Sequence, residues 1–122
     1  MESLNYESKV WGAVAHVFSS DHAAVSHLRL QPQTHCSRHF HRQRCNSFCV
    51  LSGSIVVEEW GPGLRAEKTT LIAGQQHTVP SGIVHRFRVL EAGEVVEVYW
   101  PDKGGVVKLD DIERLDEGGR DE

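Results

Sequence analysis

The chain has 122 residues, 39% hydrophobic and 25% charged, with a formal net charge of −4 at pH 7. This length predicts one domain with a single core, and the negative charge argues against a nucleic-acid-binding surface. The three cysteines, Cys36, Cys45 and Cys49, lack zinc-finger spacing, and neither a signal peptide nor a membrane-length apolar run is present, so we expect a cytoplasmic protein with free thiols.

Short segments that alternate apolar and polar residues, separated by glycine and proline turns, run along most of the chain and are typical of β-strands. The predicted strands span residues 10–19, 23–30, 48–51, 54–60, 68–72, 77–79, 84–90 and 94–100. The last two are expected to form a pair joined at Ala92-Gly93. Because no helical pattern interrupts these segments, we predict an all-β sandwich or barrel.

The character of the sequence changes after residue 101. We assign residues 1–103 to the main domain and residues 104–122 to a short acidic C-terminal extension. Residues 106–107 are expected to add a strand. Residues 109–115 are expected to form one or two helical turns, because Asp110 and Asp111 favour a helix N-terminus. The glycine-containing end is expected to be mobile.

Three histidines mark a candidate metal site. His39 and His41 are two residues apart on an extended segment, so their side chains point to the same face, and His85 follows the turn at residues 80–82. Three imidazoles inside a small barrel would form a metal site with open coordination positions, suited to Zn, Mn, Fe, Co or Ni. Asn46 is a candidate fourth ligand through its carbonyl oxygen; a hydrogen bond to a ligand or a plain core position fits this residue equally well.

The spacing of these residues resembles the two sequence motifs of the cupin superfamily. The first motif, G-x5-H-x-H-x(3,4)-E-x6-G, is matched at His39, His41, Asn46 and Gly53. The second motif, G-x5-P-x-G-x2-H-x3-N, is matched at Gly74, Pro80, Gly82 and His85. Three residues depart from the motifs: Gln33 replaces the first glycine, Asn46 the acidic ligand and Val89 the final asparagine. The resemblance implies a double-stranded β-helix, the cupin jelly roll.

Nearly the whole chain also resembles the cupin module of type II mannose-6-phosphate isomerases. VWG at residues 10–12 corresponds to the family's P-W-G, VPSGIVHR at 79–86 to I-P-A-G-x-x-H-R, and LDDIER at 109–114 to E-D-D-I-V-R. The chain has His39, Asn46 and Ser47 where the family has glutamine, glutamate and histidine. The resemblance therefore implies the fold and the metal, but not the same reaction on the same sugar.

Three further side chains are candidates for catalysis. The forked guanidinium of Arg44 suits a phosphate or a carboxylate, and a solvated surface arginine is the alternative. Glu97 or His77 is the candidate base for a carbon-bound proton; for each, an exposed side chain or one that only supports a ligand is the alternative.

Three functions are consistent with these residues. The leading hypothesis is a metal-dependent isomerase or epimerase of a sugar or sugar phosphate, in which a Lewis acid binds two substrate oxygens. The second is a metal-dependent dioxygenase with a three-histidine iron site, and the third is a non-catalytic metal- or carbohydrate-binding cupin. We expect a small-molecule partner, no nucleic acid and no membrane. Because cupin barrels pair through strand edges and apolar faces, we also expect a homodimer, with residues 10–19 and Trp100 as candidate contacts.

Overall fold

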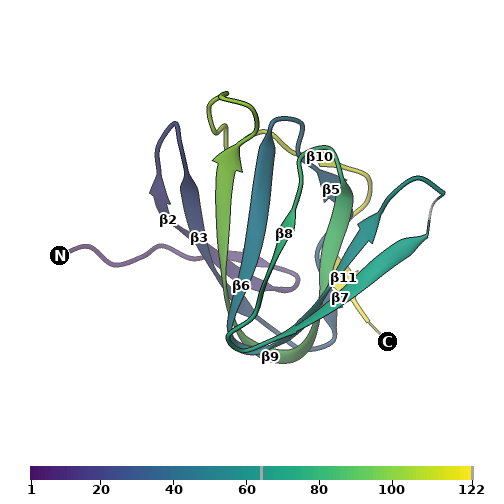
Figure 1. Ribbon diagram of the computed structural model, residues 1–122. Coiled ribbons are helices and arrows are strands. Elements are labelled where there is room, and N and C mark those ends of the chain that lie inside the picture. The colour runs from purple at the N-terminus through teal and green to yellow at the C-terminus, as the bar shows by residue number, and fades with distance from the viewer. Residues whose placement is uncertain (64, 122) are drawn as a thin grey trace.

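The computed structural model describes residues 1–63 and 65–121, which form eleven strands and no helix (Figure 1). The strands are β1 (Glu7–Lys9), β2 (Gly12–Ser19), β3 (Ala24–Leu30), β4 (Thr34–His35), β5 (His39–Phe40), β6 (Arg44–Trp60), β7 (Ala66–Ile72), β8 (Gln76–Val79), β9 (Val84–Pro101), β10 (Glu113–Arg114) and β11 (Gly119–Arg120). The all-β prediction is confirmed. Within these residues no helix is long and apolar enough to cross a bilayer.

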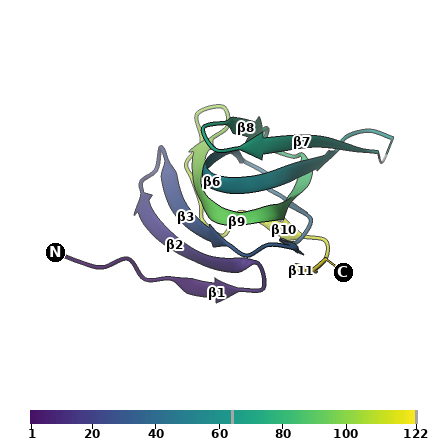
Figure 2. The same cartoon turned by 90° about the horizontal axis from the view of Figure 1, so that it is seen from below.

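Two long strands, β6 and β9, form the centre of the fold. They pair antiparallel from Arg44 opposite Pro101 to Trp60 opposite Val84. Both strands bend, so each contributes to both walls of a barrel (Figure 2). The first half of β6 also pairs with β8, and the second half with β7. The sequence predicted four shorter strands here, which is wrong: each pair forms one bent strand, because β6 and β9 remain paired on both sides of the bend.

The bend in β6 falls at Gly53, within the stretch where the register shifts between Val50 and Ile55. Gly53 has a φ of 76°, and a Cβ atom there would lie 2.5 Å from the carbonyl oxygen of Ala92. Any side chain would therefore be strained in its backbone and would collide with β9. This glycine of the first motif is required by the close approach of two bent strands.

Gln33 takes the place of the other glycine of the first motif and keeps the glycine-like conformation. Its φ is 59°, in the left-handed region that costs a non-glycine residue about 1 kcal/mol. The backbone is held on both sides: the Gln33 amide donates to the carbonyl of Val89 at 3.0 Å, and the Gln33 carbonyl accepts from the amide of Asp121 at 2.7 Å. These contacts keep the turn although its glycine is absent.

The core lies between the two walls of the barrel. β3 pairs with the second half of β9, and β2 and β1 extend that sheet. Alternate side chains along these strands point inward, where the ring of Phe87 meets those of Trp11 and Phe48 edge-on at centroid distances of 5.2 and 5.9 Å. The buried apolar cluster consists of Val14, Leu28, Leu30, Cys36, Phe48, Val50, Ile55, Val57, Leu71, Val79, Phe87, Val89 and Val95.

The C-terminal extension packs against the barrel as short strands and turns. β10 pairs with β5, and β11 pairs with β4. The helical turns expected at residues 109–115 are absent from this described segment, because its backbone groups bond to the barrel: the Leu115 amide, for example, donates to the carbonyl of Arg38 at 2.8 Å. Residues 106–107 form no strand either. The domain boundary after residue 103 stays a prediction.

Candidate metal centre

Three histidines from two distant segments converge inside the barrel. His39 in β5 is the register partner of His85 in β9, and His41 follows two residues after His39. Their ligand atoms all lie within 4.8 Å of one another. The three side chains are buried, at 8%, 2% and 1% exposure for His39, His41 and His85. The pairing of β5 with β9 therefore creates the cluster that the two motifs predicted.

The hydrogen bonds of the histidines fix the state of each ring. Each Nδ1 lies within hydrogen-bond distance of a backbone carbonyl, and because a carbonyl only accepts, such a bond requires the proton on Nδ1. The Nε of Arg44 also approaches the His41 Nδ1, at 3.3 Å, but the carbonyl contact is the shorter one, so we assign the proton to Nδ1 in all three rings. For His39, His41 and His85 in turn, the acceptors are the carbonyls of Ser37 at 2.7 Å, Asp111 at 2.7 Å and Ile83 at 2.8 Å. Each Nε2 then presents a lone pair. The Nε2 atoms of His41 and His85 are buried and have no hydrogen-bond partner among the described residues.

The rings are also held in the neutral form that a metal requires. Burial, and then the charge of His41, lowers the pKa of His39 to about 4. Burial, and then the charge of Arg44, lowers the pKa of His41 to about 4. Burial and the charge of His39 lower the pKa of His85 to about 3. At neutral pH these side chains therefore fit a divalent transition metal, which binds unprotonated imidazole.

Asn46 presents a further unpaired oxygen. Its side chain is fully buried, and its Nδ2 donates to Oε2 of Glu97 at 3.0 Å. Since a carboxylate only accepts, this bond fixes the amide with its nitrogen toward Glu97. The Asn46 Oδ1 is left buried and without a hydrogen-bond partner in the described part of the chain, as are the Nε2 atoms of His41 and His85. A buried oxygen of this kind fits a metal ligand or a group that contacts one.

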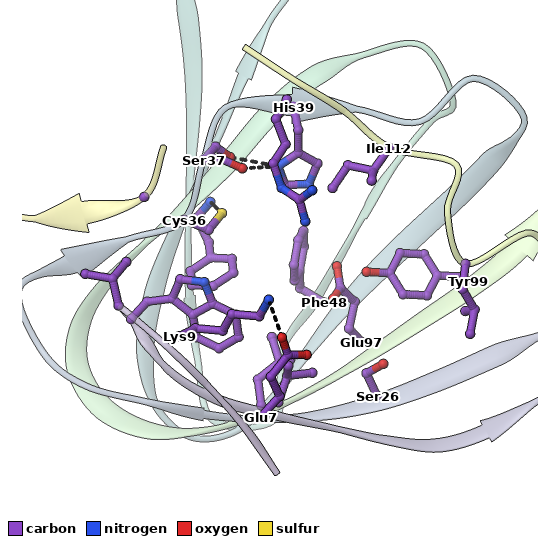
Figure 3. A pocket seen from close by; sticks show the side chains of 18 of the residues that line it. Glu7, Lys9, Ser26, Cys36, Ser37, His39, Phe48, Glu97, Tyr99 and Ile112 are labelled. Carbon is purple, nitrogen blue, oxygen red and sulfur yellow. Dashed lines mark hydrogen bonds and ion pairs between the residues drawn. The ribbon is translucent and has the colours of Figure 1, made fainter. Parts of the chain in front are cut away.

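A cavity of about 440 Å³ opens beside His39, whereas His41 and His85 are not among its lining residues (Figure 3). His39 lies at one end, and Glu7 and Lys9 of β1 lie at the other. Glu97 and Tyr99 of β9 form part of the side wall, with the Tyr99 hydroxyl directed toward the Glu97 carboxylate. The apolar wall is formed by Val10, Trp11, Val14, Leu28, Phe48 and Phe87. The cavity is large enough for a small organic molecule.

Arg44 lines the same cavity and is 4% exposed. Its Nη1 donates to the carbonyl of Lys108 at 2.8 Å, and its guanidinium stacks over the Tyr99 ring, 4.0 Å from the ring centroid. Within the described residues no carboxylate lies within ion-pair distance of Arg44. A buried cation without a paired anion is costly, so the cavity favours an anionic occupant.

Residues 26–100, more than half of the chain, match the family described as the cupin domain. The chain belongs to the cupin family. Its fold matches solved structures of oxalate decarboxylase: that of the Bacillus subtilis enzyme at pH 4.6 aligns with a TM-score of 0.75 and 19% identity over 92% of this chain. A structure concerned with the Mn(II) centres of that enzyme, and one concerned with substrate binding in oxalate decarboxylase, align with TM-scores of 0.76 and 0.77, again at 19% identity and 92% coverage.

This cupin spans 30% of the decarboxylase chain, and at this identity the likeness shows the fold alone. The expected jelly roll is thereby confirmed. Among curated protein sequences none matches the chain. Together with the three-histidine cluster, membership of the cupin family supports a divalent transition metal as the cofactor.

The two candidate bases lie in different places. Glu97 is 7% exposed and lines the cavity; burial raises its pKa, although hydrogen bonds from Tyr99 and Asn46 oppose the rise. His77 is not among the cavity-lining residues, and its Nε2 pairs with the carboxylate of Glu59. That pair connects β8 with the second half of β6. The geometry therefore brings Glu97, but not His77, to the cavity.

Two residues of this centre were missed by the sequence analysis. Tyr99 follows Glu97 by two positions on β9, so both side chains lie on the same face of the strand. The two-residue period of a β-strand could therefore have predicted that Tyr99 lies near Glu97. Asp111, whose carbonyl holds His41, lies 70 residues away along the chain, and no local pattern indicates that contact.

Exchanging Asn46 tests whether its unpaired oxygen belongs to the centre. Asn46→Glu is expected to tighten metal binding, because a carboxylate adds a negative charge beside the metal. Asn46→Ala is expected to weaken it by about ten- to a hundredfold. The measurement is competition titration against a chelator. Ser47→Ala is the matched control, since Ser47 follows in the same strand and donates to Gln76. Unchanged affinity in both Asn46 variants would remove Asn46 from the centre.

Proposed function

We propose that this cupin is a metal-dependent isomerase or epimerase of a sugar or sugar phosphate. The reaction would be similar to that catalysed by type II mannose-6-phosphate isomerases. The observation that carries the proposal is a single cavity lined by His39, Arg44 and Glu97. These three side chains offer a metal ligand, an unpaired cation and a carboxylate. Aldose–ketose isomerisation of an anionic sugar needs these three elements.

In this proposal His39, His41 and His85 hold the metal through their Nε2 atoms, and the unpaired Oδ1 of Asn46 is the candidate fourth ligand. When bound, the metal supplies Lewis-acid polarisation of the C1 and C2 oxygens of the substrate. Fixed Nδ1–H donors keep the three rings in the orientation that binding requires.

Arg44 binds the substrate anion and Glu97 transfers the proton in this proposal. Arg44 holds the phosphate or an ionised oxygen of the sugar, with its guanidinium already oriented by Tyr99 and the carbonyl of Lys108. The carboxylate of Glu97 takes the proton from C2 and returns it to C1, while a proton moves from the C2 hydroxyl to the C1 oxygen, so the reaction is redox-neutral overall. Burial raises the pKa of Glu97, which makes its carboxylate a stronger base.

A second candidate function is a dioxygenase with a three-histidine iron site. It is favoured by one observation: the fourth motif position is the neutral Asn46, so none of the four candidate ligand side chains carries a negative charge. Three neutral ligands leave the full charge of the metal available to a substrate anion and to dioxygen.

A panel of sugar phosphates, assayed with protein loaded with Zn, Mn, Co or Fe, separates these functions. Interconversion of an aldose and a ketose phosphate is expected, and Arg44→Ala should raise KM for the phosphorylated sugar by about ten- to a hundredfold. Arg42→Ala is the control, because that exposed arginine pairs with Glu113 on the surface. Oxygen uptake by the iron form without isomerisation would support the dioxygenase, and metal binding without turnover would support a binding module.

The proposed assembly is a homodimer in the cytoplasm. β1 pairs with β2 alone in the described sheet, so its outer edge is unpaired. Val10, Val17 and Phe18 nearby are 41%, 47% and 55% exposed. The free edge of β1, beside the exposed apolar side chains among residues 10–19, supports pairing of two copies through this end of the sheet.

A further inference from the structure

The segment of residues 108–121, named here the C-terminal strap, lies against the metal centre. Figure 1 shows it as the yellow end of the ribbon beside β5. β10 of the strap pairs with β5, the strand that carries His39. The carbonyl of Lys108 accepts a hydrogen bond from Arg44, and Leu109, Ile112 and Arg114 line the cavity. The strap therefore contacts the residues that the proposed function uses.

His41 differs from the other two histidines in what orients its ring. His39 and His85 each bond to a carbonyl two residues earlier in their own segments. His41 instead bonds to the carbonyl of Asp111, at 2.7 Å and 70 residues away. The orientation and tautomer of the His41 ring therefore depend on where the strap is placed.

The side chain of Asp111 fixes that placement. Its Oδ1 accepts from the backbone amide of Arg42 at 2.8 Å, and its Oδ2 accepts from that of Gln43 at 2.9 Å. These amides belong to the two residues that follow His41. Asp111 thus forms two sets of hydrogen bonds. Its backbone carbonyl bonds to the His41 ring, and its carboxylate bonds to the backbone that follows His41. Charge-assisted bonds of this kind are about twice as strong as neutral ones.

We propose that Asp111 is a positioning residue of the metal centre, which sets the metal affinity by clamping the strap to the chain after His41. The proposal rests on the metal-binding part of the proposed function. It does not depend on which reaction the cupin catalyses. It makes the C-terminal strap a component of the site.

Asp111→Ala in the full chain tests this proposal, and Asp121→Ala is the matched control. Asp121 lies in the same strap and also holds the barrel: its Oδ1 accepts from Nδ1 of His35 at 2.8 Å and from Nη1 of Arg88 at 2.5 Å. Neither bond involves the three clustered histidines or a peptide group that bonds to them. Competition titration with Zn²⁺ and Co²⁺ is expected to show about a ten- to hundredfold loss of affinity in Asp111→Ala and none in Asp121→Ala. Asp111→Asn should be intermediate, because its single oxygen can replace only one of the two acceptors.

The visible absorption of the Co²⁺-loaded protein provides a readout that a loss of stability alone does not change. Asp111→Ala is expected to shift the ligand-field bands, because one imidazole is freed to reorient, whereas Asp121→Ala should retain the wild-type spectrum. Wild-type affinity and spectrum in a folded Asp111→Ala, or equal losses in both variants, would overturn the proposal while leaving the metal site intact. Absence of metal binding in the wild type would instead overturn the proposed function.

Discussion

Replacing His39, His41 and His85 together with alanine is expected to reduce the bound divalent transition metal from about one ion per chain to none. The three Nε2 lone pairs are the buried donors that the strand pairing brings together. Without them, the neutral oxygen of Asn46 remains as the candidate ligand, and a single neutral oxygen does not retain a transition metal. Elemental analysis of the purified protein, after dialysis against a weak chelator, is the measurement.

The control for this experiment is His22→Ala, which removes an exposed histidine in the turn between β2 and β3. It should keep the full metal content, and circular dichroism should show that both variants retain their strands. Full metal occupancy in the triple variant would show that the ion binds elsewhere, and the assignment of the centre would then be wrong.

The metal-free protein is expected to lose stability as the pH falls from about 6.5 to about 4, by several kcal/mol in total. The pKa values of His39 and His41 are lowered from 6.5 to about 4, and that of His85 to about 3. Within this window the unfolded chain binds protons that the folded chain excludes, so protonation favours unfolding. Chemical denaturation at a series of pH values, in the presence of a chelator, measures the effect.

The carboxyl groups of Glu97 and Asp111 also contribute to the pH dependence of stability. The raised pKa of Glu97 acts in the opposite direction, because the folded state then holds its proton more tightly. The lowered pKa of Asp111 acts only as the pH falls below the usual 3.8 of an aspartate. The triple-alanine variant, which lacks the buried imidazoles, should therefore have a flatter profile between pH 6.5 and 4. Parallel profiles for both proteins would contradict this origin of the acid sensitivity.

Much of the fold and of the metal centre follows from short-range sequence patterns. The strand period places His39 and His41 on one face, and the glycine and proline turns bound most of the strands. The resemblance to the first cupin motif also implied a glycine at the position of Gln33, and the φ of 59° there shows that the backbone keeps the conformation typical of glycine. Local patterns are sufficient where a backbone requirement involves only neighbouring residues.

Other features depend on contacts between distant segments. The glycines near the middle of β6 and β9 indicate turns when each segment is considered alone, and only their mutual pairing keeps both strands continuous. The acidic pattern at residues 109–115 favours a helix locally, but its carboxylates and backbone groups bond to the barrel instead. The sequence offered His77 as one of two candidate bases, whereas its pairing with Glu59 depends on the arrangement of β8.

The pairing of β6 with β9 also bears on how the protein folds and unfolds. It joins residues 24 positions apart at Trp60 and Val84, and 57 apart at Arg44 and Pro101. A chain must lose much loop entropy before such distant contacts form, so folding is expected to be slow for a domain of this size. Since each long strand belongs to both walls, neither wall can come apart while the other stays intact. Thermal denaturation should therefore proceed as a single all-or-none transition.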